Sequence, residues 1–300
     1  MAIPYSKPAL DHAAQLAQLK ARGMVVEDDA AALHWLEHFN YYRLGAYWLP
    51  FEANHQHHQF KPGTTFSAVL GLYEFDRQLR LLMLDALARI EVSARAQWAY
   101  QLGMRHGAHA HLDPKLAVNR RHWQSNVTKL AEQVERSDEI FIRHLRRTYS
   151  EALPPVWAAC EVMSLGLLSR WYANLRPKPT RRAIASAYGA DDRLLGSWLH
   201  HLTHVRNICA HQARLWNRDF TITPQMARTK PPALVSQLVP RSRKLYNTLV
   251  IAAYLMDVIE PRNDWGSRMQ LLLREYQPPL HMMGFPTGWQ QHAAWRGANG

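Results

Sequence analysis

Cysteine is scarce in this chain, which contains only Cys160 and Cys209 among 300 residues. Both thiols lie in apolar stretches that read as helical. Two such residues support neither a disulfide framework nor a zinc site built from cysteines. A reducing cytoplasm is the simplest environment for this composition.

Long apolar runs are lacking as well. The most apolar segment, residues 249–259, is shorter than the roughly 18 apolar residues that a membrane-spanning helix needs. The first residues do not combine a basic segment with an apolar stretch, as a secretory signal peptide does. We therefore expect no membrane partner. The sequence also lacks an internal repeat and any convincing strand-like alternation of apolar and polar residues.

Acidic residues are outnumbered by basic ones. The chain has 36 Lys and Arg against 24 Asp and Glu, which gives a formal net charge of +12. A field of this sign favours a polyanionic partner, and nucleic acid is the usual one. Composition alone leaves open a basic surface that serves only solubility.

Helical periodicity dominates what is present, and we predict an all-α fold. The expected arrangement is a helical bundle over residues 62–262 with an N-terminal helical extension over residues 1–61. A C-terminal tail over residues 263–300 is expected to be mobile because of Pro278-Pro279 and its glycine-rich end. The predicted helices cover residues 9–23, 27–40, 63–102, a short stretch ending at 149, and residues 156–174, 194–216 and 241–259.

The segment from Leu194 to Trp216 is the most informative of these helices. It contains no proline, and Asp191-Asp192 precede it where a helix N-cap is expected. At about 100° per residue, one side of this helix is apolar and the opposite side is polar. The apolar side carries Leu195, Trp198, Leu202, Val205 and Cys209, and the polar stripe carries His200, His204, Asn207 and His211. A buried core helix has no need of such a stripe.

Arg206 and His211 form an Arg-x4-His pattern within this helix. A neutral histidine can take a proton from a ribose 2′-hydroxyl or give one to a leaving 5′-oxygen. An arginine can stabilise the extra negative charge of a phosphorane-like transition state. RNA carries its own nucleophile, so this chemistry needs no metal ion.

The spacing of the pattern also bears on assembly. The two side chains project about 140° apart on a straight helix, so one helix does not trivially bring both to one phosphate. Pairing of the helix with a second copy would collect two arginines and two histidines in one symmetric cleft. The pattern by itself is weak, since Arg206 as a surface charge and His211 as a satisfied helix histidine fit the bare spacing equally well.

Other histidine groups give weaker signals. His55, His57 and His58 lie in a polar loop without a cysteine or carboxylate at ligand spacing, and we interpret them as solvated. A metal-dependent hydrolase built on His200, His201 and His204 is a distant alternative, because that run has no acidic partner. We therefore predict no metal and no cofactor.

The motif helix also carries a family resemblance. Residues 206–218, Arg-Asn-Ile-Cys-Ala-His-Gln-Ala-Arg-Leu-Trp-Asn-Arg, resemble the signature helix of the Abi (abortive infection, AbiD/AbiF-like) proteins of the HEPN superfamily. Further blocks resemble this family in the same order, at residues 7–8, 19–24, 39–44, 72–80, 89–91, 155–157 and 165–169. The resemblance thus extends over most of the chain before residue 220.

This resemblance implies an all-α, HEPN-type bundle, usually dimeric, that cuts RNA without metal in phage defence or as a toxin. It marks Arg206 and His211 as the catalytic pair and Asn207 as the polar residue that assists them. We expect the homodimer to form through the motif helices. His204, Arg214 and Arg218 are the further residues that we expect to contact RNA.

Several alternatives stay open on the sequence. A binding module that holds a structured RNA without cutting it has the same basic character, and so does a scaffold that acts only with a partner protein. A lethal nuclease must also be restrained when idle. The sequence leaves open whether a regulatory RNA, an antitoxin protein or the chain's own tail does so.

Overall fold

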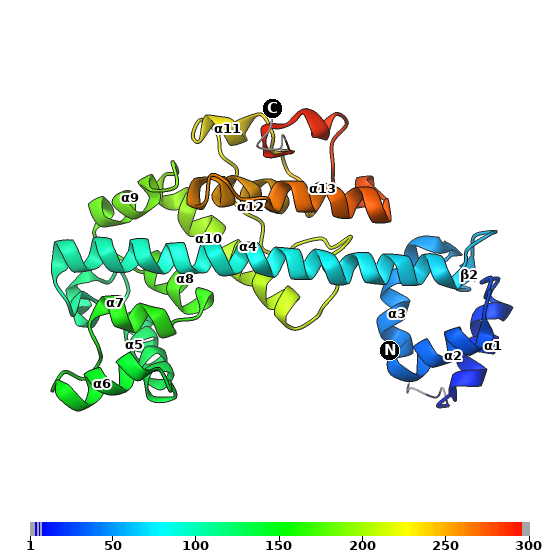
Figure 1. The fold of residues 1–300 in the computed structure, drawn as a ribbon, viewed down its shortest axis with the longest axis horizontal. Helices are drawn as coiled ribbons and strands as arrows, with labels where there is room; N and C mark the ends of the chain where they lie inside the picture. The colour runs from blue at the N-terminus through cyan, green and yellow to red at the C-terminus, as the bar shows by residue number, and fades with distance from the viewer. Residues whose placement is uncertain (1–3, 5, 7, 296–300) are drawn as a thin grey trace. The chain divides into compact units, whose positions relative to one another are not determined.

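The computed structural model describes residues 4, 6 and 8–295 (Figure 1). The chain falls into two compact units. The first unit comprises residues 1–78 and 272–278, and the second comprises residues 79–271 and 279–300. The predicted all-α fold is confirmed: in the described part of the chain the one β-sheet is a two-stranded hairpin.

The division between the units does not follow the segments expected from the sequence. Helix α4 (Phe66–His106) begins in the first unit and continues into the second. Helix α13 (Trp265–Tyr276) begins in the second unit and ends in the first. Two helices therefore run through the boundary, which a segmentation into consecutive stretches of sequence does not anticipate.

The first unit contains short helices and the hairpin. Its elements before α4 are α1 (His12–Ala21), α2 (Asp29–His38), α3 (Tyr41–Trp48), the 3-10 turn η1 (Leu49–Phe51), β1 (Glu52–Asn54) and β2 (Gln59–Phe60). The strands pair antiparallel, with Glu52 opposite Phe60. The side chains of Asp11, Asp28 and Asn40 each accept a hydrogen bond from a first-turn backbone N–H and so begin the three helices. The two N-terminal helices predicted from the sequence are confirmed by α1 and α2.

The second unit holds the remaining helices. They are α5 (Arg120–Glu135), α6 (Ile140–Thr148), α7 (Val156–Ala159), α8 (Leu165–Ala173), α9 (Lys178–Ser186), α10 (Asp192–Ala210), α11 (Pro232–Val235) and α12 (Tyr246–Ile259). The 3-10 turns are η2 (Ala110–Leu112), η3 (Pro114–Leu116), η4 (Cys160–Val162), η5 (Leu280–Met283), η6 (Trp289–Gln291) and η7 (Ala293–Trp295). Among the largest fully buried side chains of this unit are Trp98, Trp198, Trp216, Trp265 and Tyr246.

Two helices expected to be continuous are broken. The stretch before residue 149 forms α5 and α6 with a break around Ser137, and the stretch after Pro155 forms α7, η4 and α8. The second break has a clear local cause, because Met163 is extended and the Ser164 hydroxyl accepts a hydrogen bond from the Leu167 N–H. This N-cap starts a new helix where the periodicity of the sequence suggested a continuation.

The expected mobile tail is ordered over most of its length, so that prediction is wrong for the described residues. Residues 265–276 form α13, in which Trp265 is fully buried and donates from its indole N–H to the Leu82 carbonyl at 2.8 Å. Trp295, near the end of the described chain, is also buried. The rest of the predicted tail, residues 296–300, lies outside the described residues.

Helix α10 is held in place at its start and along its apolar side. The Asp191 carboxylate accepts hydrogen bonds from the N–H groups of Arg193 and Leu194 at 2.9 and 2.8 Å, which confirms the predicted cap. The helix packs against α8 and α9 (Figure 1). All five residues predicted for the apolar side are buried, namely Leu195, Trp198, Leu202, Val205 and Cys209.

Candidate functional site

The polar stripe of α10 lies on the exposed side of the helix, as predicted. His200, Asn207 and His211 are exposed, and His204 is half-buried. His211 is the C-cap residue, and its backbone N–H donates to the Asn207 carbonyl at 3.0 Å. Asn207 and His211 are therefore neighbours one turn apart on the same face of the helix.

The helix ends earlier than the sequence predicted. Its last residue is Ala210, and the expected continuation to Trp216 is wrong. The N–H of Ala213 donates to the Ile208 carbonyl and that of Gln212 to the Cys209 carbonyl, both at 3.0 Å. These two bonds form a Schellman motif, with Gln212 in the left-handed conformation at φ +54° where glycine is usual. The turn places His211 at the exposed end of the helix.

The segment after the turn is anchored on both sides. Leu215 and Trp216 are completely buried. The side chain of Lys244 donates to Asn217 at 3.2 Å and pairs with Asp219 at 3.1 Å, and Phe220 and Arg243 exchange hydrogen bonds at 2.9 Å. The chain then runs back along α10, since the Gln225 N–H donates to Ser197 at 2.8 Å and the Trp198 indole donates to the Gln225 carbonyl. The residues of the motif are thus carried by a fixed helix end.

The predicted catalytic side chains are not engaged in polar interactions with other described residues. Within the part of the chain that the structure describes, the side chains of Arg206, Asn207 and His211 have no hydrogen bond or ion pair. Arg206 is half-buried and follows the buried Val205, whereas Asn207 and His211 are exposed. Polar groups without internal partners at a well-anchored helix end are available to an external ligand.

The three residues predicted to contact RNA lie in the same region but differ in their surroundings. The Arg218 guanidinium donates from Nε to the Arg214 carbonyl at 2.8 Å, and both arginines are half-buried. The ring of His204 packs edge-on against Phe220, with a centroid distance of 6.3 Å. Partial burial lowers the pKa of His204, and the positive charge of Arg218 and the neighbouring His200 lower it further. The lowered pKa favours the neutral form of the His204 ring beside the Arg218 cation.

The electrostatics of this helix end have a direct consequence for anion binding. The C-terminus of an α-helix carries partial negative charge, which does not attract phosphate. Arg206, Arg214 and Arg218 carry the positive charge near it. Any phosphate bound here depends on these side chains rather than on the backbone.

His201, the remaining histidine of this helix, is a core residue. It is fully buried, with Nδ1 2.7 Å from the Ile222 carbonyl and Nε2 2.8 Å from the Thr248 hydroxyl. Nδ1 must therefore carry the proton, and Nε2 accepts from Thr248. Burial lowers the pKa of His201 to about 4. Both ring nitrogens are engaged, so the metal-dependent alternative built on His200, His201 and His204 loses a ligand.

The histidines of the hairpin are not simply solvated, which corrects the expectation for this loop. The buried Glu52 carboxylate lies 2.7 Å from Nδ1 of His55 and 3.3 Å from Nδ1 of His58. The expectation overlooked Glu52, which precedes His55 by three residues and which also lies close to His58 in the hairpin. His57 is exposed.

Comparison with known proteins identifies the family of this chain. The sequence model of the family described as Abi-like protein matches residues 34–217, more than half of the chain. The chain belongs to the Abi-like protein family. No curated protein and no solved structure matches it.

The matched range of this Abi-like protein contains the whole of α10 and the turn that follows it. Arg206, Asn207 and His211 all fall within it, and the range ends at Asn217. The resemblance seen in the sequence is thereby confirmed at the level of the Abi-like family. Membership implies a role in abortive infection, a form of defence against phage.

Two further expectations concern membrane-spanning helices and the two cysteines of the Abi-like protein. In the part of the chain that the structure covers, we find no helix both long and apolar enough to cross a membrane. Cys160 and Cys209 are both buried, and neither forms a disulfide bond. Burial raises the pKa of the Cys160 thiol to about 12, with the Glu161 carboxylate contributing. This thiol is therefore protonated at neutral pH.

Proposed function

We propose that this Abi-like protein is an endoribonuclease of the HEPN type, acting in phage defence or as a toxin and cutting RNA without a metal ion. The observation that carries the proposal is the end of α10. Arg206, Asn207 and His211 gather there, free of internal partners among the described residues and within the range matched by the family. The net charge of +12 supports a polyanionic substrate.

Each of the three residues has a defined role in this mechanism. His211 transfers a proton, as general base toward the ribose 2′-hydroxyl or general acid toward the leaving 5′-oxygen. The Arg206 guanidinium stabilises the negative charge that accumulates on the phosphate. The Asn207 amide orients either a phosphate oxygen or the His211 ring. Attack by the 2′-oxygen leaves a 2′,3′-cyclic phosphate and a 5′-hydroxyl, because the nucleophile belongs to the RNA itself.

The position of Arg206 favours a site shared between two protomers. Arg206 and His211 project from different sides of α10, and Arg206 is the more buried of the two. A two-fold axis beside the exposed stripe would bring His211 of one protomer toward Arg206 of the other. We therefore propose a homodimer through the motif helices, with His204, Arg214 and Arg218 contacting the RNA backbone around the cleft.

One observation favours a second function, RNA binding without cleavage. Catalytic histidines are commonly oriented by a third group, and within the described residues no carboxylate or carbonyl contacts the His211 ring. On this alternative the same cleft holds a structured RNA. A restraining partner, either a regulatory RNA or an antitoxin protein, would fit both functions.

The test is incubation of the purified protein with labelled total RNA in EDTA. We expect the wild type to cut RNA and both His211→Ala and Arg206→Ala to slow cleavage by at least about 100-fold. His122→Ala, which removes an exposed histidine of α5 away from the motif helix, is the control and should cut like the wild type. A 5′-hydroxyl end is detected by direct phosphorylation with a polynucleotide kinase, and a 2′,3′-cyclic phosphate by its resistance to a phosphomonoesterase until acid opens the ring.

The possible outcomes bear on both functions, RNA cleavage and RNA binding without cleavage. Cleavage that persists in His211→Ala, or products with 5′-phosphates, would refute the proposed mechanism. Intact RNA in every lane, together with tight and salt-sensitive binding by the wild type, would favour the binding module or a nuclease that lacks its activating trigger.

A further inference from the structure

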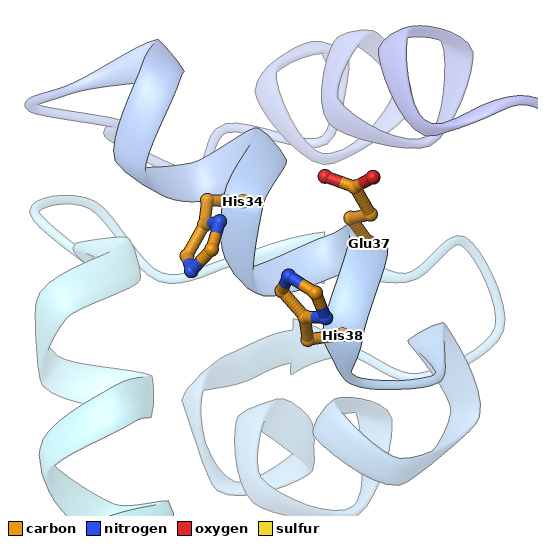
Figure 2. Close-up of side chains that lie close together, drawn as sticks. All are labelled: His34, Glu37 and His38. Carbon is orange, nitrogen blue, oxygen red and sulfur yellow. The ribbon is translucent and has the colours of Figure 1, made fainter.

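A second cluster of ligand-type side chains lies in the first unit, on helix α2. His34, Glu37 and His38 occupy positions i, i+3 and i+4 of this helix and are all exposed. Figure 2 shows the three side chains leaving the same helix, with the two imidazole rings next to each other. The sequence analysis did not single out this group.

The geometry of the cluster suits a metal ion. One ligand atom from each residue can be chosen so that all three lie within 4.8 Å of one another. Donors bound tetrahedrally to zinc at 2.0–2.1 Å are separated by about 3.3 Å. The difference is about 1.5 Å, which exposed side chains can close by rotating about their own bonds. Helix spacing brings the donors together without any change in the backbone.

The three side chains have no competing polar partners among the described residues. In the described part of the chain none of them forms a hydrogen bond or ion pair with another residue; the contact seen is that between the two rings, whose centroids are 4.6 Å apart. The contrast with neighbouring groups is informative. Asp29 on the same helix is paired with Lys20, and Glu52 is shared by two histidines. Glu37 is left as an unpaired carboxylate beside two imidazoles.

We propose that His34, Glu37 and His38 bind a divalent transition-metal ion, with Zn²⁺ as the ion of choice. Two imidazole nitrogens and one carboxylate oxygen are borderline donors, which suit zinc and its neighbours rather than magnesium or calcium. The site is open and has three protein ligands, so water completes the coordination. We expect a dissociation constant on the order of 10 μM, weaker than that of closed four-ligand structural sites.

Metal binding here would stabilise the C-terminal end of α2 in the first unit. His38 is the last residue of α2, and the chain turns at Phe39 before Asn40 caps α3. A metal that bridges His34 and His38 fixes the final turn of α2 in its helical form. Zinc should therefore raise the thermal stability of this unit, because a ligand that binds only the folded form stabilises it.

The test is a zinc titration of the full-length protein, freed of any affinity tag and stripped with a chelator. We expect about one Zn²⁺ per chain by calorimetry. His34→Ala and His38→Ala should each weaken binding at least about tenfold, since each removes one of three donors, and Glu37→Gln should weaken it less. Zinc should raise the melting temperature of the wild type but not of the two alanine variants.

Two control variants locate the ion. His12→Ala removes an exposed helical histidine of the same unit, and His55→Ala removes a histidine that contacts Glu52. Both should bind zinc like the wild type. Loss of binding in His55→Ala but not in His34→Ala would overturn the assignment, and so would a wild type that binds no zinc at about 100 μM. RNA cleavage does not enter these measurements, so they are independent of the proposed nuclease.

Discussion

His201 and His211 show how differently two histidines of one helix can be used. His201 is enclosed in the core with both nitrogens bonded, whereas the His211 side chain stands at the exposed helix end without a partner among the described residues. Ten residues separate them, which on an α-helix amounts to nearly three turns and places them on different sides. Only the exposed one is available for chemistry on a substrate.

The buried histidine makes the stability of the fold dependent on pH. The pKa of His201 is lowered by burial to about 4, below the usual 6.5. As the pH falls below about 6.5 the unfolded chain binds a proton that the folded chain does not, so stability decreases down to about pH 4. The loss caused by this residue at pH 5, compared with pH 7.5, is about 2 kcal/mol.

His201→Asn tests this prediction, because asparagine can still donate to the Ile222 carbonyl but does not titrate. We expect the variant to be less stable than the wild type at pH 7.5 and to lose about 2 kcal/mol less on acidification to pH 5, measured by urea unfolding. His111, whose pKa burial also lowers to about 4, contributes equally to both proteins. Equal losses in the two proteins would contradict the assignment.

At the scale of elements, the cap of α10 is the contact that begins the motif helix. Asp191→Ala removes two hydrogen bonds to backbone N–H groups and should destabilise the second unit by about 1 kcal/mol. Asp191→Asn keeps a side-chain acceptor and should retain most of the stability. Chemical denaturation of the three proteins measures their free energies of unfolding. An alanine variant as stable as the wild type would show that the cap is dispensable.

The same helix shows what sequence can and cannot predict. Its start was predictable because Asp191 is a strong N-cap, and its buried face because the apolar residues follow the helical period. Its end was not, because the left-handed residue is Gln212 rather than glycine, and no proline follows. The burial of Leu215 and Trp216 is a tertiary requirement that local sequence does not express.

The prediction of a mobile C-terminal tail was wrong for a related reason. Pro278-Pro279 and the glycines suggested a mobile tail, but Trp265 and Trp295 are each buried against residues distant in sequence. For the candidate site, the structure neither confirms nor contradicts the prediction. The roles of Arg206, Asn207 and His211 stay predictions, since the structure places them together on one helix end without showing a substrate. The α2 cluster could not be singled out from the sequence because its three residues lie on an exposed helix face, where polar side chains are usual.

At the scale of the whole molecule, the proposed nuclease combines a net charge of +12 with a site that, on our proposal, one chain only half completes. A charge of +12 favours a polyanion such as RNA in a manner that weakens with salt, but charge alone does not cut RNA. The proposed cleavage requires Arg206 and His211 at the same phosphate. If two motif helices meet across a two-fold axis, each complete site takes its arginine from one protomer and its histidine from the other.

This arrangement predicts complementation between two inactive variants. When Arg206→Ala and His211→Ala proteins are mixed in equal amounts and allowed to exchange subunits, half of the dimers are mixed. Each mixed dimer contains one intact site and one doubly defective site, so the mixture should recover about a quarter of the wild-type cleavage rate. Mixing either variant with the Arg206→Ala/His211→Ala double variant should restore nothing. Mixed dimers that form but stay inactive would show that each site belongs to one protomer, and a protein that stays monomeric at working concentration would rule out the shared site.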